Sequence, residues 1–579
     1  MFNKLFRTPL FAAFFCAATL IACSEGQSTS QSGYAKCDIQ TTSIAGIQGA
    51  LPGSAMVDKR LTIQGVVTLV HDGDGLYMEE PGSDTDNGTS NAIFVQTTNL
   101  PAGIEPGSWI SAQGTVAELP RGRNTLTALV NVSEVKHCSQ DQTLPVTDVT
   151  LPLRGLEREA FESMRIRIDD TLTVTDTYQF GRGRISVAGN GLQFVPTEVT
   201  APGPEAVKHT QKNRDFSLRV LFPKEATGPA LLPAGSIISS VMGVLGHGKR
   251  NLQLALQSVT TGAQPVLEIP VSPGAGEIRV VGMNLHNFFN GDGKGGDFPT
   301  PRGAKTTAEF ANQRQRLGAA IRALNPHVLA VMELENDGFD ALSAAADFIS
   351  LAGESTGASW QVVRPTGDDT GDDKITVGLF YRNDLLETVG SARTLTGPEF
   401  RKSRQPMAQV FQQRSNGEKV LIVVNHLKSK GSCPDSGIDA NQKDGQGCWN
   451  PMRVASAEKM SAWVNSLSAS TQTDNALILG DMNAYRQEDP IDVIRDAGFV
   501  ELMDSKQGNT YSFMYFGQAG TLDYAFASKA LVQKIQQTFI WNVNAGLPAH
   551  MELPEPWMRF SDHDPVVVDL SLRQSSTSD

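Results

Sequence analysis

The chain has 579 residues, a length that predicts two to four domains instead of one hydrophobic core. Hydrophobic residues make up 40% of it and charged residues 19%, as in ordinary soluble globular proteins. The formal net charge of −13 excludes a protein that coats nucleic acid through bulk positive charge. It leaves open a local contact with phosphate beside a metal-binding acidic site.

Residues 1–22 have the pattern of a bacterial lipoprotein signal peptide. Lys4 and Arg7 give a positive start, and the apolar run LFAAFFCAATLIA ends immediately before Cys23. We expect Cys23 to be lipidated and residues 23–33 to form a polar tether; an ordinary signal peptide is the alternative. The protein is therefore expected to be exported, either as an outer-membrane lipoprotein held in the membrane by its lipid anchor or as an extracellular, cell-surface protein.

Four cysteines remain once the signal peptide and the lipidated cysteine are set aside, and four cysteines allow three pairings. The economical pairing joins Cys37 to Cys138 around the first domain and Cys433 to Cys448 across one loop. An oxidising compartment outside the cytoplasm makes both disulfides plausible. A metal site built from these cysteines is not expected, because no two of them stand close together as in a CxxC motif.

Two β-rich segments follow the tether. Residues 34–140 alternate short apolar runs with turns, which predicts a small β-barrel or β-sandwich. Residues 141–265 look like a diverged second copy, because GSWISAQGTV at 107–116 parallels GSIISSVMGV at 235–244. Two small all-β modules of this size resemble the oligonucleotide/oligosaccharide-binding (OB) barrel. Unrelated β modules that share a turn pattern are the alternative.

The sequence pattern changes at about residue 275, where apolar runs begin to alternate with helical segments. In TTAEFANQRQRLGAAIRALN, for example, Phe310, Leu317 and Ile321 recur on one helical face. Strands interleaved with helices over residues 275–572 predict one large α/β (α+β) domain, a four-layer sandwich of sheets and helices. The C-terminal tail RQSSTSD is expected to be disordered.

Several apolar strands of this domain end in a polar residue with metal-binding, basic or donor capacity. ALILG, for instance, runs directly into Asp481 and Asn483. The full set is Asn284, Glu333, His426, Asp481 with Asn483, Asp523, and Asp562 with His563. Turn-capping explains single cases, but six strand ends in one domain favour a common cleft. Carboxylate and amide oxygens suit Mg²⁺, Mn²⁺ or Ca²⁺, and the histidines, which lack HExxH spacing, suit acid–base work. Together they indicate hydrolysis of a phosphate ester.

These motifs resemble those of the endonuclease/exonuclease/phosphatase superfamily, which has the fold of deoxyribonuclease I. Over residues 275–570 the matching motifs occur in the family's order: MN, AVMELEN, VNHLKSKG, GDMNA, TLDYAF and SDHDP. The secreted bacterial nuclease group resembles this chain further, in a Cys-loop-Cys segment ending in GQGCWN and in β modules ahead of the catalytic domain.

The resemblance implies a metal site in which Glu333 is the principal ligand and Asn284 and Asp562 complete or support it. The ion would be Mg²⁺ or Mn²⁺, with Ca²⁺ as an alternative. Some family members place an acidic residue two positions after the first asparagine, where this chain has His286. We expect His286 to pack near the site or to donate to a ligand.

The resemblance also implies the catalytic roles. Asp481 and Asn483 would position the attacking water and hold the scissile phosphate, and either Asp481 or His563 would take the water's proton. Asp523 would orient the His563 imidazole and stabilise its cationic form. His426 would donate to a phosphoryl oxygen or to the leaving group.

Three basic residues are candidates for contacts with flanking phosphates: Arg404, Lys428 and Lys430. Solvated surface positions are the alternative for all three. Asp373, at the start of a predicted strand, is a candidate to orient His426, with a solvated acidic loop as the alternative.

The sequence therefore predicts a metal-dependent nuclease that acts on extracellular nucleic acid as a DNA endonuclease, with DNA favoured over RNA. We expect the protein to be a monomer. We expect no nucleotide cofactor, because the glycine-rich loop at 291–296 lacks the ending of a nucleotide P-loop. One alternative is a phosphodiesterase of the same fold acting on a phospholipid or a small phosphate ester, although no exposed aromatic hairpin for membrane insertion is evident. Another is a non-enzymatic surface binding protein.

Overall fold

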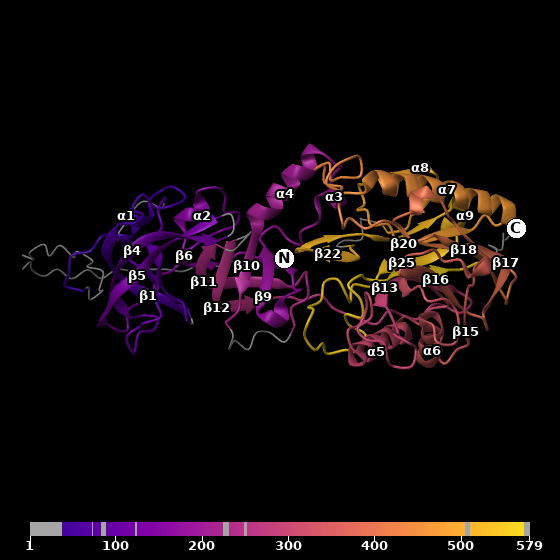
Figure 1. Cartoon of the computed structure of the whole chain (residues 1–579), viewed down its shortest axis with the longest axis horizontal. Helices are drawn as coiled ribbons and strands as arrows, with labels where there is room; N and C mark the ends of the chain where they lie inside the picture. The colour runs from indigo at the N-terminus through magenta and orange to yellow at the C-terminus, as the bar shows by residue number, and fades with distance from the viewer. Residues whose placement is uncertain are drawn as a thin grey trace, which may run out of the picture.

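The protein is described here from a computed structural model, which is drawn in Figure 1. The described residues are 37–71, 73–82, 88–121, 124–223, 231–247, 252–503 and 510–572. The predicted signal peptide, the predicted lipidation site Cys23, the predicted tether and the C-terminal tail RQSSTSD lie outside them. Among the described helices, none combines the length and the apolar composition that crossing a membrane requires.

The first described unit is a closed β-barrel, which we call the barrel. Its strand order is β1-β2-β3-β5-β4, and β4 closes it by pairing with β1. Apolar side chains such as Ile63, Val67 and Ile110 fill its interior, and a disulfide joins Cys37 to Cys138 as predicted. The elements are α1 (Ile44–Gln48), β1 (Arg60–His71), β2 (Gly75–Glu79), β3 (Ala92–Gln96), β4 (Trp109–Arg121) and β5 (Asn124–Ser139).

The second unit, which we call the second module, is a seven-stranded sheet of order β12-β10-β9-β8-β11-β7-β6, in which β12 also pairs with β11. The two similar sequences noted above, at 107–116 and 235–244, lie at the start of β4 and β11. Each of these strands begins an antiparallel pair, β4–β5 and β11–β12. The elements are β6 (Thr147–Asp148), α2 (Glu157–Ala160), β7 (Arg165–Ile168), β8 (Leu172–Asp176), η1 (Phe180–Arg182), β9 (Arg184–Ala188), α3 (Pro196–Val199), α4 (Pro204–Phe216), β10 (Ser217–Leu221), β11 (Ile237–His247) and β12 (Leu252–Thr261).

The second module is not all-β, so that part of the prediction is wrong. Helix α4 spans 13 residues and begins with Pro204, a residue favoured at the first helical position. Only Ala206 and Asn213 of this helix are buried. The helix therefore has no apolar stripe, and hydrophobic periodicity, the main sequence signal for a helix, is absent from it.

The C-terminal half contains two six-stranded sheets, of order β15-β16-β14-β13-β26-β25 and β17-β18-β19-β20-β24-β21, and a separate hairpin, β22–β23. The elements of the first sheet and its helices are β13 (Ile278–Phe288), α5 (Thr307–Leu324), β14 (Val328–Glu335), α6 (Ala344–Thr356), β15 (Trp360–Val362), η2 (Thr366–Asp368), β16 (Ile375–Arg382), β25 (Ile535–Ile540) and β26 (Val566–Leu570). Those of the second sheet, its helices and the hairpin are β17 (Leu386–Thr394), η3 (Pro398–Phe400), β18 (Met407–Gln413), β19 (Lys419–His426), α7 (Asn450–Thr471), β20 (Ala476–Asp481), α8 (Asp489–Asp496), β21 (Val500–Glu501), β22 (Phe513–Tyr515), β23 (Gln518–Gly520), β24 (Asp523–Ala527) and α9 (Lys529–Val532).

The two sheets pack face to face. Residues such as Val280, Ala330, Val424 and Leu479 form the core between them. Helices α5 and α6 cover the outer face of the first sheet, and α7 and α8 cover the outer face of the second, so the helices flank the domain in Figure 1. The prediction of a mixed α/β domain after a β-rich region is confirmed.

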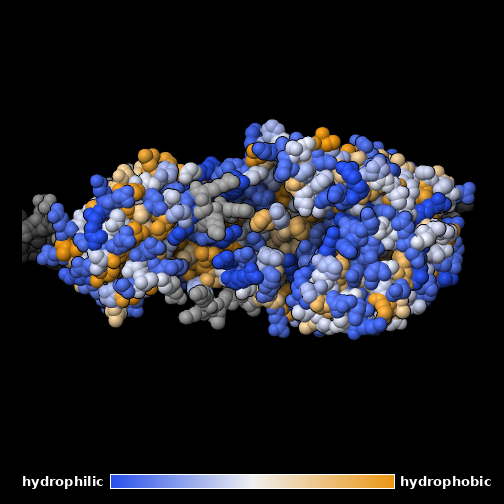
Figure 2. Space-filling model, viewed as in Figure 1, coloured by the Kyte–Doolittle hydropathy of each residue, from blue (hydrophilic) through white to orange (hydrophobic). Residues whose placement is uncertain are grey.

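Local signals explain where the long helix α5 begins and ends. The Thr306 hydroxyl accepts a hydrogen bond from the backbone N–H of Glu309 (3.1 Å), which caps the first turn. Asn325 takes a left-handed conformation (φ 47°) that ends the helix. On the face shown in Figure 2, hydrophilic residues dominate the C-terminal half and apolar residues are scattered among them, as expected for a surface in water.

Candidate active site

The predicted polar strand ends meet along one rim of the paired sheets. Strands β19 and β20 run parallel, with His426 aligned to Asp481 at their ends. Strand β24 pairs with β20 on its other side and places Asp523 opposite Asp481. All six residues of β20 are buried. The apolar run ALILG therefore builds the core, and the buried carboxylate of Asp481 follows it at the end of the strand.

Asp481, Asp523 and His563 form one compact cluster. A ligand atom from each lies within 4.8 Å of the others. His563 Nδ1 donates to Asp523 Oδ2 over 2.7 Å, and His426 Nε2 lies 3.4 Å from Asp481 Oδ2. The backbone N–H of Asn483 donates to Asp481 Oδ1 (2.8 Å) and fixes that carboxylate. The five residues predicted to be catalytic therefore lie together in the structure.

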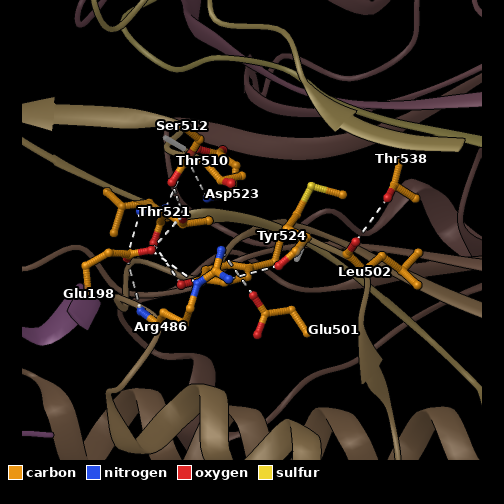
Figure 3. Close-up of polar contacts among 12 residues, drawn as sticks. Glu198, Arg486, Glu501, Leu502, Thr510, Ser512, Thr521, Asp523, Tyr524 and Thr538 are labelled. Atoms are coloured by element: carbon orange, nitrogen blue, oxygen red, sulfur yellow. Dashed lines mark hydrogen bonds and ion pairs between the residues drawn. The ribbon is translucent and has the colours of Figure 1, made fainter. Parts of the chain in front are cut away.

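Ser512 supports this cluster and was missed by the sequence reasoning. Its hydroxyl donates to Asp523 Oδ2 (2.7 Å) and accepts from the backbone N–H groups of Leu522 and Asp523 (3.0 Å each); Figure 3 shows it beside Asp523. The ring of the next residue, Phe513, lies 4.6 Å from the His563 ring, centre to centre. No motif includes Ser512, and a single serine gives no spacing pattern from which its role could be predicted.

The cluster holds its titratable groups in different protonation states. Burial works against a charged His563, but the carboxylates of Asp523, Asp481 and Asp562 raise its pKa well above the usual value. Burial, with the charges of Arg404 and His563, lowers the pKa of His426 well below its usual range. Burial and the neighbouring Asp523 raise the pKa of Asp481 to about 7. At neutral pH the site therefore pairs a cationic His563 with a neutral His426, and Asp481 is able to gain or lose a proton.

The three predicted metal-binding residues are linked by the turn that follows Asn284. Asn284 Oδ1 accepts from the backbone N–H of His286 (2.9 Å). Glu333 Oε2 accepts from the backbone N–H of Asn287 (3.0 Å). His286 Nδ1 lies 3.2 Å from Asp562 Oδ1, so His286 contacts a candidate ligand as expected.

The donor set at this turn fits a hard divalent cation. Asn284, Glu333 and Asp562 offer amide and carboxylate oxygens and no sulfur, as Mg²⁺, Mn²⁺ and Ca²⁺ prefer. The amide nitrogen of Asn284 is buried without a hydrogen-bond partner. Glu333 adopts a left-handed conformation (φ 63°) at an irregularity between β14 and β16. Strained backbone conformations of this kind often cluster at functional sites.

The charge of Arg404 interacts with carboxylates of both the turn and the cluster. Burial lowers the pKa of its guanidinium, while the charges of Asp481, Asp373 and Glu333 act to raise it. Arg404 Nη2 donates to the Leu427 carbonyl (3.2 Å), and its Nε is buried without a partner. Asp373 lies 2.9 Å from Arg302 and 4.0 Å from Arg404, so its ion pairs are with arginines and not with His426.

Comparison with known families decides what kind of domain this is. Residues 284–563 match the model of the Endonuclease/Exonuclease/phosphatase family. This region of the chain belongs to that family. The matched segment begins at the candidate ligand Asn284 and ends at the catalytic candidate His563. No curated protein matches the chain in sequence.

Solved structures of endonuclease/exonuclease/phosphatase proteins also match about half of the chain. A Bacteroides vulgatus family member is 16% identical, covers 51% of this chain and 99% of its own, and has a TM-score of 0.34. The human Nocturnin catalytic domain with bound sulfate is 17% identical and covers 51% and 93%, with a TM-score of 0.34. D. rerio TDP2 complexed with a single-strand DNA product is 12% identical and covers 51% and 98%, with a TM-score of 0.33.

The two candidate lysines of the endonuclease/exonuclease/phosphatase domain are occupied by local contacts. Lys428 Nζ donates to the carbonyls of Ser429 (2.8 Å) and Gly431 (3.1 Å) and lies 5.3 Å from the Trp449 ring. Lys430 Nζ donates to the Gln446 carbonyl and pairs with the buried Glu488. These contacts anchor the loop closed by the predicted disulfide Cys433–Cys448 and favour a structural role for both lysines.

The domain also carries an exposed aromatic hairpin, contrary to the sequence analysis. Strands β22 and β23 pair antiparallel, and the tip places Tyr515 and Phe516 in solvent, 58% and 69% exposed. The turn uses left-handed conformations at Phe516 (φ 48°) and Gly517 (φ 77°). The sequence signal for this hairpin is the Phe-Gly pair at its turn. The signal is weak, because a left-handed conformation is rare for a bulky residue such as phenylalanine.

Proposed function

We propose that this protein is a metal-dependent phosphodiesterase that cleaves nucleic acid outside the cytoplasm, with DNA as the preferred substrate and cleavage within the strand. The observation that carries the proposal is the cluster of Asp481, Asp523 and His563 beside His426 at the sheet rim. The family match supports hydrolysis of a phosphate ester. The choice of DNA rests on the resemblance of the motifs to secreted bacterial nucleases.

In the proposed mechanism, His563 acts as the cation that receives the phosphate. Asp523 holds Nδ1 of His563 (2.7 Å), so the opposite nitrogen, Nε2, carries a proton that is donated to a non-bridging phosphoryl oxygen. Neutral His426 has one nitrogen beside Asp481 and the other, Nδ1, buried without a partner. A phosphoryl or leaving-group oxygen would supply that missing partner.

Asp481 is the proposed general base. Because His563 is already protonated, it cannot take the proton of the attacking water at neutral pH. Asp481 can, since its pKa of about 7 lies near the working pH. The Asn483 backbone N–H keeps Oδ1 of Asp481 in place, and Oδ2, which lies 3.4 Å from His426 Nε2, would accept the proton.

Glu333, Asn284 and Asp562 would hold the divalent cation, Mg²⁺ or Mn²⁺ with Ca²⁺ as an alternative. A cation bound there supplies positive charge against the developing negative charge of the phosphoryl oxygens. Arg404, whose charge interacts with those of Asp481 and Glu333, would add a second positive charge. Its buried Nε without a partner is consistent with a contact to a phosphate oxygen.

A cavity of about 1100 Å³ adjoins the candidate metal site and supports an extended substrate. It is lined by His286, Arg302, Gln313 and Arg316, among others. A small phosphate ester would leave most of this space unused, whereas a polynucleotide would place flanking nucleotides in it. We propose that the barrel and the second module, in their OB-like form, present the polymer to this cleft.

We further propose the exported, lipid-anchored form of the protein, with residues 1–22 removed and Cys23 lipidated at the outer membrane. The two disulfides are consistent with an oxidising compartment. Metabolic labelling with palmitate, with Cys23→Ser as the control, tests the anchor. An unlabelled wild-type protein would rule it out.

A phospholipid headgroup is the second candidate substrate, favoured by one observation. The exposed aromatic side chains Tyr515 and Phe516 stand next to the catalytic cluster through Phe513, and aromatic tips of this kind insert into membrane interfaces. Purified mature protein incubated with plasmid DNA, RNA or sphingomyelin vesicles, each with Mg²⁺ or EDTA, separates the candidates. Turnover of sphingomyelin alone would replace the nuclease proposal, and no turnover of any substrate would favour a binding protein.

A further inference from the structure

One buried carboxylate of the second module contacts the catalytic domain. Glu198 lies on the short helix α3 and is only 5% exposed. Its Oε1 accepts from Arg486 Nε (3.2 Å) and from the Thr521 hydroxyl (3.0 Å). Its Oε2 accepts from the backbone N–H groups of Arg486 (3.3 Å) and Thr521 (2.9 Å). Figure 3 shows Glu198 between these two partners.

The two partners belong to the two segments that carry catalytic side chains. Arg486 follows Asp481 and Asn483 on the loop after β20, and Thr521 stands two residues before Asp523. The Tyr524 hydroxyl also lies between these segments, because its oxygen is within hydrogen-bond distance of the carbonyls of Ala484 (3.1 Å) and Thr521 (2.8 Å). Glu198 completes this junction from outside the catalytic domain.

The four hydrogen bonds explain why a charged residue is buried here. Burial raises the pKa of Glu198 to about 7, although the Thr521 and Arg486 contacts lower it. Without the Glu198 carboxylate, the Nε of Arg486 and the N–H of Thr521 would lose their acceptor inside the protein, and an unsatisfied buried donor is costly. Both segments would then move toward other acceptors.

Neighbouring backbone contacts hold Glu198 in position. The Val195 N–H donates to the Ala519 carbonyl (2.9 Å), and the Ala519 N–H donates to the Gln193 carbonyl (2.8 Å), so residues 193–195 run alongside β23. The Gln487 N–H donates to the Thr197 carbonyl (2.9 Å). The second module is therefore docked along both segments, and the Glu198 side chain projects from a fixed backbone.

We infer that Glu198 is a positioning residue for the active site: it holds the segment of Asp481 and the segment of Asp523 in register, so that the second module completes the catalytic geometry. The inference rests on the proposed function for its kinetic consequence. Thr521 connects through Leu522 to Asp523, whose carboxylate orients His563. A displacement of Thr521 therefore shifts the Asp523–His563 pair relative to Asp481.

The kinetic test uses the full mature chain with Glu198→Gln and Glu198→Ala. Gln keeps the size but replaces one acceptor oxygen by a donor, and Ala removes both acceptors. On plasmid DNA with Mg²⁺ we expect kcat to fall by about 3- to 10-fold for Gln and about 10- to 100-fold for Ala, because small misplacements of catalytic groups are expensive. KM should stay within about twofold, since the substrate contacts remain.

Glu205→Gln is the matched control. Glu205 belongs to the same module, but it is exposed and pairs only with Lys208 among the ion pairs of the described residues (2.7 Å). It should leave kcat unchanged. An unchanged kcat in folded Glu198→Gln and Glu198→Ala proteins would overturn the inference.

Hydrogen–deuterium exchange provides a readout that does not require activity. Glu198→Ala should raise exchange in the segments 482–487 and 519–523 and leave the interior of β19 protected. If the wild type cleaves none of the nucleic acids, the proposed function fails, while this exchange result still supports or overturns the positioning role of Glu198. Unchanged exchange in both segments would overturn it.

Thr521→Val offers a second route if Glu198→Ala does not fold. It deletes one donor to Glu198 and keeps the carboxylate with its Arg486 contacts. We expect a smaller fall in kcat, and the Glu198→Gln/Thr521→Val double variant should lose less than the two single losses combined, as residues in one network do. Full additivity would show that the two residues act separately and would overturn the inference.

Discussion

Replacing Asp523 by asparagine tests the proposed mechanism most directly. Asn is nearly the same size as Asp, so the packing at the end of β24 is kept. The change removes the negative charge that lies 2.7 Å from His563 Nδ1. It also leaves Ser512, which donates to the same Asp523 oxygen, free to hydrogen-bond to an amide oxygen instead.

The size of the effect follows from that buried contact. A hydrogen bond to a charged group contributes about 1.5–3 kcal/mol, and about 1.36 kcal/mol is a factor of ten in rate. If His563 must be cationic in the transition state, kcat should fall by about 10- to 150-fold. The pKa of His563 should also fall, because burial lowers it and the Asp523 charge is the largest influence that raises it.

The assay is plasmid nicking with Mg²⁺ between pH 6 and pH 9, with circular dichroism as a control for folding. Since the pKa of His563 falls in the variant, its remaining activity should decline at a lower pH on the alkaline side than that of the wild type. An Asp523→Asn protein that is folded and has the wild-type kcat and alkaline limb would refute the role assigned to the pair.

Three further predictions concern the base, the disulfides and the core. The wild-type kcat should fall as the pH drops below about 7, because Asp481 must lose its proton to act as a base. Asp481→Asn should reduce turnover at least about 100-fold without unfolding the protein. A wild-type kcat that does not change on the acidic side of the pH profile would contradict this role. Reductant should lower the melting temperature, since the bonds Cys37–Cys138 and Cys433–Cys448 close loops of 101 and 15 residues, worth about 3–5 kcal/mol each in the chain-entropy model; an unchanged melting temperature would argue against both bonds. Arg279→Met should cost about 3–5 kcal/mol of unfolding free energy in urea titrations, because it leaves Asp569 as a buried charge without its 2.7 Å partner, and Arg414→Met, at an exposed ion pair, should cost less than about 1 kcal/mol.

The sequence was sufficient for those parts of the site that depend on regular strands. ALILG followed by Asp481 predicts a buried strand with a polar end, and parallel pairing with β19 brings His426 to the same rim. Asp523 and His563 are then placed by the strands next to β20 and β13. Strand pairing brings these separate motifs together at one rim, so the order of the motifs along the chain was enough to predict the cluster.

The parts that the sequence did not reveal depend on contacts between distant segments. Glu198 and Thr521 are 323 residues apart, and no periodicity relates them. Helix α4 lacks an apolar face, and Ser512 is a single polar residue whose importance lies in its three hydrogen bonds to the segment of Asp523. Such features are tertiary, because each local sequence is compatible with several structures and the partner decides among them.

The docking of residues 193–198 against the catalytic half limits how this architecture can be divided. A fragment that begins at residue 275 would lose the acceptor for Thr521 and the neighbour of β23 together. Inheritance and engineering should therefore treat the second module and the hydrolase domain as a single unit. The described residues of the barrel make none of these contacts and are joined to the second module instead, for example where the Thr127 N–H donates to Glu162 Oε1 (2.9 Å).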